Sequence, residues 1–200
     1  MRKLLALLLL VALAFGTWWF FFKDKSHDSG PKQQPLNVGK HSSEFTQSIS
    51  SVVTAYLSLK EAFVNADMVK IKEEEKHLVA TLDSIRLDEL KKDTTGIFQS
   101  AQLLIGDIRS NAEAIFQETD ITEMRQDFRM VSENLFPLLK TIRYEGTKLY
   151  WQNCPMAFGE GKDASWISST EEIINPYLGK NHPEFKSTML HCGEIKDTIQ

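Results

Sequence analysis

The two cysteines of this 200-residue chain lie in its last quarter, and each has a methionine close by. Cys154 and Met156 form a Cys-x-Met pair, and Met189 and Cys192 form a Met-x-x-Cys pair. His191 directly precedes the second cysteine. Thiolates, thioethers and an imidazole are soft ligands that favour Cu(I) and, less selectively, Zn(II). These five residues are therefore candidate ligands of a soft-metal site.

A disulfide is the competing interpretation of the same two cysteines. In an exported domain, a pair of cysteines is oxidised by default. Closing the loop from Cys154 to Cys192 would stabilise the fold by roughly 4 kcal/mol in the chain-entropy model. The flanking methionines favour the metal, and the cysteine count favours the disulfide. The two forms can also interconvert, with only the reduced pair binding metal, so both interpretations stay open.

The metal interpretation requires the two Cys/Met pairs to converge. A residue before proline is pushed towards extended backbone, which directs the side chains of Cys154 and Met156 the same way. A helical turn over residues 189–192 would place Met189 and Cys192 on one face, whereas a strand would pair Met189 with His191. Gly193 follows directly and favours the turn, which makes His191 the weaker ligand.

The N-terminal segment predicts an attachment to a membrane. After Arg2 and Lys3, an apolar run extends from residue 4 to residue 22, close to the length that spans a bilayer, with aromatic residues clustered at its far end. Cleavage after Gly16 would release a secreted form but would leave an exposed aromatic terminus. We therefore expect residues 1–22 to be an uncleaved signal anchor or transmembrane helix in the inner membrane. The domain would then be periplasmic or otherwise extracytoplasmic.

Residues 23–41 are polar, contain glycine and proline, and predict a flexible linker in which His27 and His41 are exposed. Residues 42–142 then show apolar side chains at helical spacing in four successive stretches. Asp67, Thr94 or Thr95, and Asp120 are expected helix caps. We expect Pro137 to kink the fourth helix or to end it early. The four stripes are Phe45–Phe63, Met68–Ile85, Ile97–Ile115 and Met124–Ile142.

Four such helices with short connections predict an all-α fold, an antiparallel four-helix bundle. The remainder, residues 143–200, is rich in aromatic residues and punctuated by glycine and proline, so we expect an irregular C-terminal cap on the bundle. Within this cap, Ser168 to Glu171 has the spacing of a capping box and predicts a short helix through Ile174. The sequence Asn175-Pro-Tyr-Leu-Gly179 predicts the turn that ends it.

Several motifs resemble an uncharacterised bacterial extracytoplasmic domain family. They are Tyr150-Trp-Gln-Asn-Cys-Pro-Met-Ala157, Trp166-Ile-Ser168, Ile174-Asn-Pro-Tyr-Leu-Gly179 and Met189-Leu-His-Cys-Gly193, with a similar helical start at Ala55–Ala62 and Ala66-Asp67. The resemblance covers roughly residue 42 to the end, and residues 180–188 look like an insertion. That family occurs alone behind a signal sequence and also as the C-terminal module of heavy-metal efflux periplasmic adaptor proteins. The resemblance implies a partner among heavy-metal efflux components.

Composition and motifs exclude other classes of function. A content of 42 % hydrophobic and 25 % charged residues is that of a globular chain, and the net charge of −4 with no basic stripe argues against nucleic acid. The sequence contains no phosphate-binding glycine loop, no Gly-x-Ser-x-Gly and no His-Glu-x-x-His, so we expect a non-enzyme. The first hypothesis is a soft-metal module, with Cu(I) or Zn(II), accessory to efflux. The alternative is a metal-free helical interaction domain closed by a Cys154–Cys192 disulfide.

Overall fold

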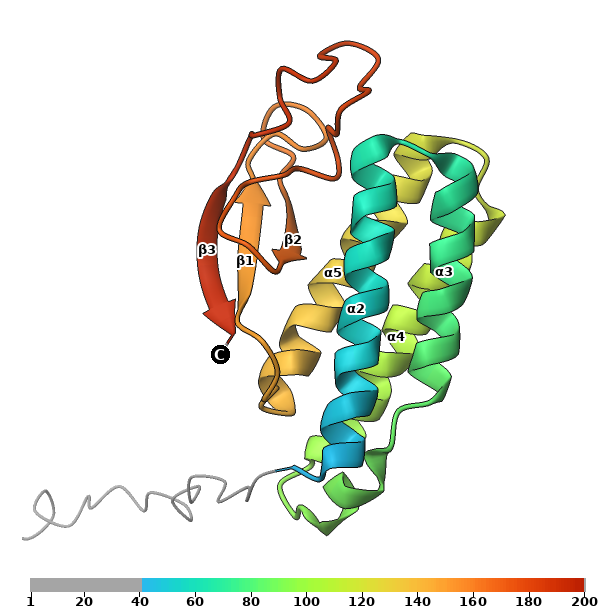
Figure 1. The fold of residues 1–200 in the computed structure, drawn as a ribbon, viewed down its shortest axis with the longest axis vertical. Coiled ribbons are helices and arrows are strands. Elements are labelled where there is room, and N and C mark those ends of the chain that lie inside the picture. The colour runs from blue at the N-terminus through green and yellow to red at the C-terminus, as the bar shows by residue number, and fades with distance from the viewer. Residues whose placement is uncertain (1–40, 200) are drawn as a thin grey trace, which may run out of the picture. The chain divides into compact units, whose positions relative to one another are not determined.

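The structure, a computed structural model, describes residues 41–199 and is mostly helical (Figure 1). Within these residues, no helix combines the length and the apolarity needed to cross a membrane. The predicted signal anchor and residues 23–40 of the predicted linker, His27 included, lie outside the described part. The elements in chain order are α2 (Ser43–Asn65), α3 (Met68–Asp83), the short 3-10 helix η1 (Leu87–Lys92), α4 (Ile97–Gln117), α5 (Ile121–Thr141), β1 (Leu149–Cys154), β2 (Ala164–Ser168) and β3 (Glu194–Ile199).

The four α-helices pack as the predicted bundle, each against its neighbour in the chain. Their apolar stripes point inwards, with Phe45, Leu78, Ile108 and Phe128 all buried. Asp67 and Asp120 cap α3 and α5 by accepting hydrogen bonds from backbone N–H groups of the first turn, as predicted.

The predicted cap of α4 is wrong, and so is one of the two alternatives predicted for Pro137, an early end of α5. Neither Thr94 nor Thr95 caps α4, because Gly96 is the N-cap and Asp93 holds the Thr95 N–H and hydroxyl outside the helix. Pro137 does not end α5, which continues to Thr141. A proline there leaves one carbonyl without its helical donor but does not stop the helix.

The C-terminal part contradicts the all-α prediction. The cap is not irregular, because it contains a three-stranded antiparallel sheet in the order β2-β1-β3 (Figure 1). Tyr150 lies opposite Ser168 on one side and Thr198 on the other, and β2 packs on α5. The alternation that marks a half-buried strand is missing, because every residue of β2 is buried and β3 is exposed up to its last residue.

The predicted short helix from residue 168 to residue 174 is also absent. The amide nitrogen of Gln152 in β1 lies within 3.0 to 3.4 Å of the carbonyl oxygens of Thr170, Glu171 and Glu172. The hydroxyl of Ser168 accepts from the N–H of Thr170 in a local turn. A side chain from the sheet therefore takes the carbonyl groups that a helix would have used, and the segment follows the sheet instead.

Two buried tyrosines connect the bundle to the sheet. The Tyr56 hydroxyl in α2 lies 2.7 Å from the Ser132 hydroxyl in α5 and accepts from the backbone N–H of Ile167 in β2 at 3.0 Å. The Tyr177 hydroxyl donates to the carbonyl of Ser165. Phe128 lies among these rings, with its centroid 5.3 Å from that of Tyr56 and 5.9 Å from that of Tyr177. The sheet is thus attached to the bundle by polar as well as apolar contacts.

Replacing Tyr56 by phenylalanine should lower the free energy of unfolding by about 1–3 kcal/mol, because the Ile167 N–H is left buried without an acceptor. Urea unfolding followed by circular dichroism measures the change. Tyr150→Phe is the matched control, because the Tyr150 hydroxyl bonds Glu171 at the surface and its loss should cost less than about 0.5 kcal/mol. Equal losses in both variants would contradict a buried polar link.

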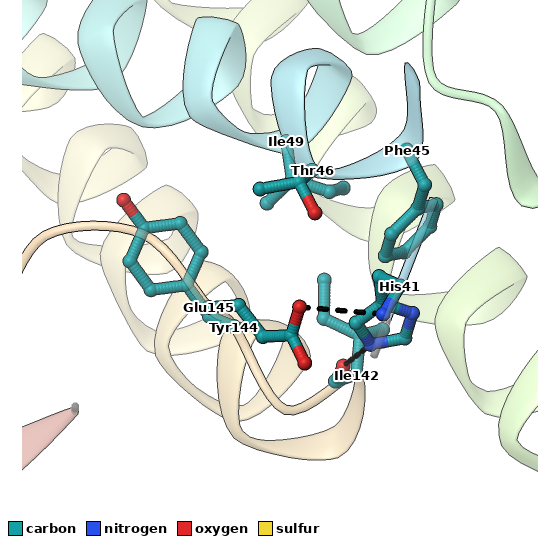
Figure 2. A pocket seen from close by; sticks show the side chains of 7 residues that line it. All are labelled: His41, Phe45, Thr46, Ile49, Ile142, Tyr144 and Glu145. Carbon is teal, nitrogen blue, oxygen red and sulfur yellow. Dashed lines mark hydrogen bonds between the residues drawn. The ribbon is translucent and has the colours of Figure 1, made fainter. Parts of the chain in front are cut away.

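His41 lies just before α2 and its side chain is buried. The prediction that His41 is exposed is therefore wrong. Its side chain is only 3 % exposed, with Nδ1 2.5 Å from a Glu89 carboxylate oxygen and Nε2 2.6 Å from the Ile142 carbonyl oxygen. Figure 2 shows the ring beside Phe45 and Ile142, with Glu145 accepting from the His41 backbone N–H. The adjoining cavity of about 10 Å³ is no larger than one water molecule, so it is not a ligand site.

Glu89 should make stability fall at acidic pH. Burial alone would raise the pKa of Glu89, but hydrogen bonds from Ser42 and His41 outweigh it and hold that pKa below its ordinary value. A carboxyl whose folded pKa is depressed adds stability above its unfolded pKa and loses it as pH falls through the folded value. Urea midpoints measured between pH 7 and pH 3 should fall less steeply for Glu89→Gln than for the parent. Glu160→Gln, at an exposed position, should keep the parent slope, and an unchanged slope for Glu89→Gln would contradict the assignment.

Candidate functional site

Cys154 and Cys192 are joined by a disulfide, with their Cα atoms 5.6 Å apart. Cys154 is the last residue of β1 and is fully buried, and Cys192 lies two residues before β3. The bond therefore connects the central strand to the segment that leads into the edge strand paired with it. The two cysteines that both interpretations share are brought together here, and in this form the sulfurs carry no thiolate that could bind a metal.

Residues 189–192 form a turn, in which the Cys192 N–H donates to the Met189 carbonyl at 3.0 Å. This is the geometry that the turn interpretation required. Met189 is partly buried, whereas Met156 is 37 % exposed. Nδ1 of His191 lies 2.8 Å from the Ile173 carbonyl oxygen, which makes that nitrogen the donor and leaves Nε2 as the free ring nitrogen.

Of the five predicted ligands, the two cysteines are therefore directly bonded, and His191 is bound through one nitrogen to backbone. Within residues 41–199 there is no cluster of three or more histidine, cysteine, aspartate and glutamate side chains that could hold a metal ion. A soft-metal site at this position would require reduced cysteines, with methionine sulfur or Nε2 of His191 as further ligands.

Asn175 organises the surroundings of the disulfide, although sequence reasoning treated it only as part of a turn. It is fully buried, and its side-chain nitrogen donates to the Cys192 carbonyl at 2.9 Å. Its side-chain oxygen accepts from the N–H groups of Tyr177 and Leu178, and its own N–H donates to the Leu190 carbonyl. The side chain thus fixes the Asn-Pro-Tyr turn and the cysteine turn to each other. The Asn-Pro dipeptide indicated the first contact but not the second.

Gly193, which follows Cys192, is closely packed against β1 and Trp166. Gly193 has a φ of +145°, and a Cβ built on it would lie 2.9 Å from the Asn153 carbonyl oxygen and 2.9 Å from a ring carbon of Trp166. Trp166 is fully buried and is a core side chain. The surroundings of the disulfide are therefore closely packed, and position 193 has no room for a side chain.

Comparison with known proteins gives one match. Residues 52–146 match the model of a family described as a protein of unknown function (DUF3347). The matched segment contains most of the bundle and ends before β1, so neither cysteine lies within it. The chain matches no curated protein and no solved structure.

Proposed function

We propose that this chain is a metal-free interaction domain of the cell envelope, non-enzymatic and closed by its disulfide. The N-terminal segment would hold it at the outer side of the inner membrane. The Cys154–Cys192 bond carries the proposal, because disulfides form and persist in oxidising compartments and are rare in the cytosol. The net charge of −4 agrees with a protein rather than a nucleic-acid partner.

The cap is the part of the domain that we propose for contact with a partner. It presents Met156 and Ile195, which are among the few large apolar side chains exposed on the described residues. Ile195 belongs to β3, an edge strand that pairs with β1 on one side only. Exposed apolar side chains beside an unpaired strand edge are common features of binding surfaces.

Site-specific cross-linking in intact cells tests this proposal. A photoreactive amino acid at position 156 or 195 should give an adduct with one envelope protein, identified by mass spectrometry. The same amino acid at position 103, an exposed leucine on α4, is the control on the bundle and should give only background. The adduct should also be lost when both cysteines are replaced by serine. Equal labelling from position 103, or labelling that survives loss of the disulfide, would contradict the proposal.

A soft-metal function is the second candidate, favoured by the closeness of the two cysteines. Their Cα separation of 5.6 Å would keep both thiolates within reach of one ion after reduction, and Met189 lies in the same turn as Cys192. Thiolate and thioether sulfur select Cu(I) over harder ions. This candidate retains the predicted link to heavy-metal efflux components.

Titration of the reduced protein with Cu(I) against a competing chelator separates the two candidates. One equivalent bound by the parent and none by Cys154→Ser would support the metal function, and a further loss of affinity in Met189→Leu would assign the thioether. Absence of uptake after verified reduction would contradict it and leave the disulfide-closed interaction domain.

A further inference from the structure

Arg125 in α5 is a buried cation that forms no salt bridge within residues 41–199. The residue is 4 % exposed, and its Nε and Nη2 atoms are buried with no hydrogen-bond partner among the described residues. Burial lowers the pKa of Arg125 to about 10, and attraction to Asp120 offsets this only in part. An unpaired charge of this kind costs several kcal/mol of folding free energy, so it calls for a specific explanation.

The two unpartnered nitrogens form one recognition edge. In a guanidinium group, Nε–H and one N–H of Nη2 point in the same direction and together match the two oxygens of a carboxylate. The Phe63 carbonyl accepts from Ala66 and the Val64 carbonyl accepts from Lys180, and neither is a hydrogen-bond partner of Nε or Nη2. The end of α2 therefore supplies a favourable dipole for the arginine, while this edge makes no hydrogen bond among the described residues.

The backbone at Gly179 lies against the same group. Its φ is +60°, and a Cβ built there would lie 3.3 Å from Nη2 of Arg125 and 2.7 Å from the Val64 carbonyl oxygen. Gly179 leads into the loop of residues 180–188, which Lys180 and Asn181 attach to Asn65 at the end of α2. This loop is the segment that looked like an insertion in the sequence.

His182 fixes the conformation of this loop in its neutral form. Its Nδ1 accepts from the backbone N–H groups of Glu184 and Phe185, and its ring stacks on that of Phe185 at 4.9 Å. Burial, followed by repulsion from Arg125, lowers the pKa of His182, while Glu184 opposes and Lys186 adds to the effect. Protonation at Nδ1 would remove the acceptor of both N–H groups and would place a second positive charge near Arg125.

We propose that the Nε/Nη2 edge of Arg125 is a binding site for a carboxylate group, reached when the loop of residues 180–188 moves away from the end of α2. Protonation of His182 favours this movement, so the site opens as the pH falls. The sign follows from linkage, because a histidine with a depressed folded pKa stabilises the closed loop above its unfolded pKa and loses that contribution as pH falls through the folded value.

The test uses the full-length chain in detergent micelles, labelled with ¹⁵N-arginine. Sodium acetate is titrated at constant ionic strength against sodium chloride, at pH 7.5 and at pH 5.5, and the arginine Nε–H resonances are followed. The Arg125 resonance, assigned by its disappearance in Arg125→Lys, should shift saturably with acetate and not with chloride, with at least a threefold lower midpoint at pH 5.5. Arg129, whose Nε already binds Glu133 at 2.7 Å, is the internal control and should not shift.

His182→Asn distinguishes carboxylate binding at Arg125 from the pH-dependent movement of the loop. The asparagine oxygen can accept hydrogen bonds from the same two N–H groups but does not titrate. This variant should bind acetate with the same midpoint at both pH values. A peptide rich in glutamate is compared with acetate at equal carboxylate concentration. Tighter binding of the peptide assigns the site to a partner's acidic side chain, and equal binding assigns it to a small organic acid.

Three outcomes would overturn the proposal. A shift that is the same with chloride, or absent at both pH values, would show that Arg125 does not bind a carboxylate. A larger response to inorganic phosphate would show a site for another oxyanion. The same pH dependence in His182→Asn and in the parent would refute the role of the histidine.

Discussion

The double variant Cys154→Ser, Cys192→Ser is expected to unfold with a free energy about 4 kcal/mol lower than that of the oxidised parent. The bond closes a loop with a sequence separation of 38, and the chain-entropy model gives this value for a loop of that length. The edge strand β3 depends on it because β3 pairs with β1 alone and is exposed up to its last residue.

Urea unfolding with and without reductant measures this effect. The reduced parent and the double-serine variant should show the same loss, since both lack the cross-link. Met156→Leu with Met189→Leu is the control, because it keeps the disulfide and should change the free energy of unfolding by less than about 1 kcal/mol. A loss of under about 1 kcal/mol in the double-serine variant would show that the sheet is held by other contacts.

Gly193→Ala is expected to have the second-largest effect, with a loss of about 3 kcal/mol. Two costs combine, since alanine is strained at a φ of +145° and its Cβ would overlap the Asn153 carbonyl oxygen and Trp166 at 2.9 Å. Neither neighbour can yield easily, because one is backbone in β1 and the other is a fully buried ring. The loss should come with a change in the near-ultraviolet circular dichroism of the tryptophans.

Gly159→Ala is the matched control for this prediction. Gly159 also has a positive φ, +107°, but a Cβ built there meets nothing within 4 Å. It should therefore show only the backbone cost, about 1 kcal/mol. If the two alanine variants lose the same free energy, close packing around Gly193 contributes nothing and the prediction is wrong.

The helical part of the fold could be predicted because its signals are local. Apolar residues at helical spacing define each of the four helices, and Asp67 and Asp120 cap theirs through backbone groups two and three residues ahead. The sheet could not be predicted in this way. Its strands lack an alternating pattern, and β3 is placed by pairing with β1, about 45 residues earlier in the chain. Only long-range pairing identifies these residues as strands.

The site was predictable in its composition but not in its geometry. The sequence identifies the cysteines, the methionines beside them and the turn before Gly193. It does not reveal that Asn175 reaches the Cys192 carbonyl, or that His41 is held by Glu89 and Ile142, because each of these contacts joins distant segments. The burial of Arg125 was missed for the same reason, since an arginine on an amphipathic helix is usually solvated.

The sheet order has a consequence for how this chain is made. β1 and β2 are synthesised before β3, so the central strand keeps one unpaired edge until the last strand has been made. During that interval Cys154 has no partner cysteine, because Cys192 lies 38 residues later in the chain. Completion of the cap therefore depends on its final strand, and slowing synthesis near residue 190 should lengthen the time for which Cys154 is a free thiol.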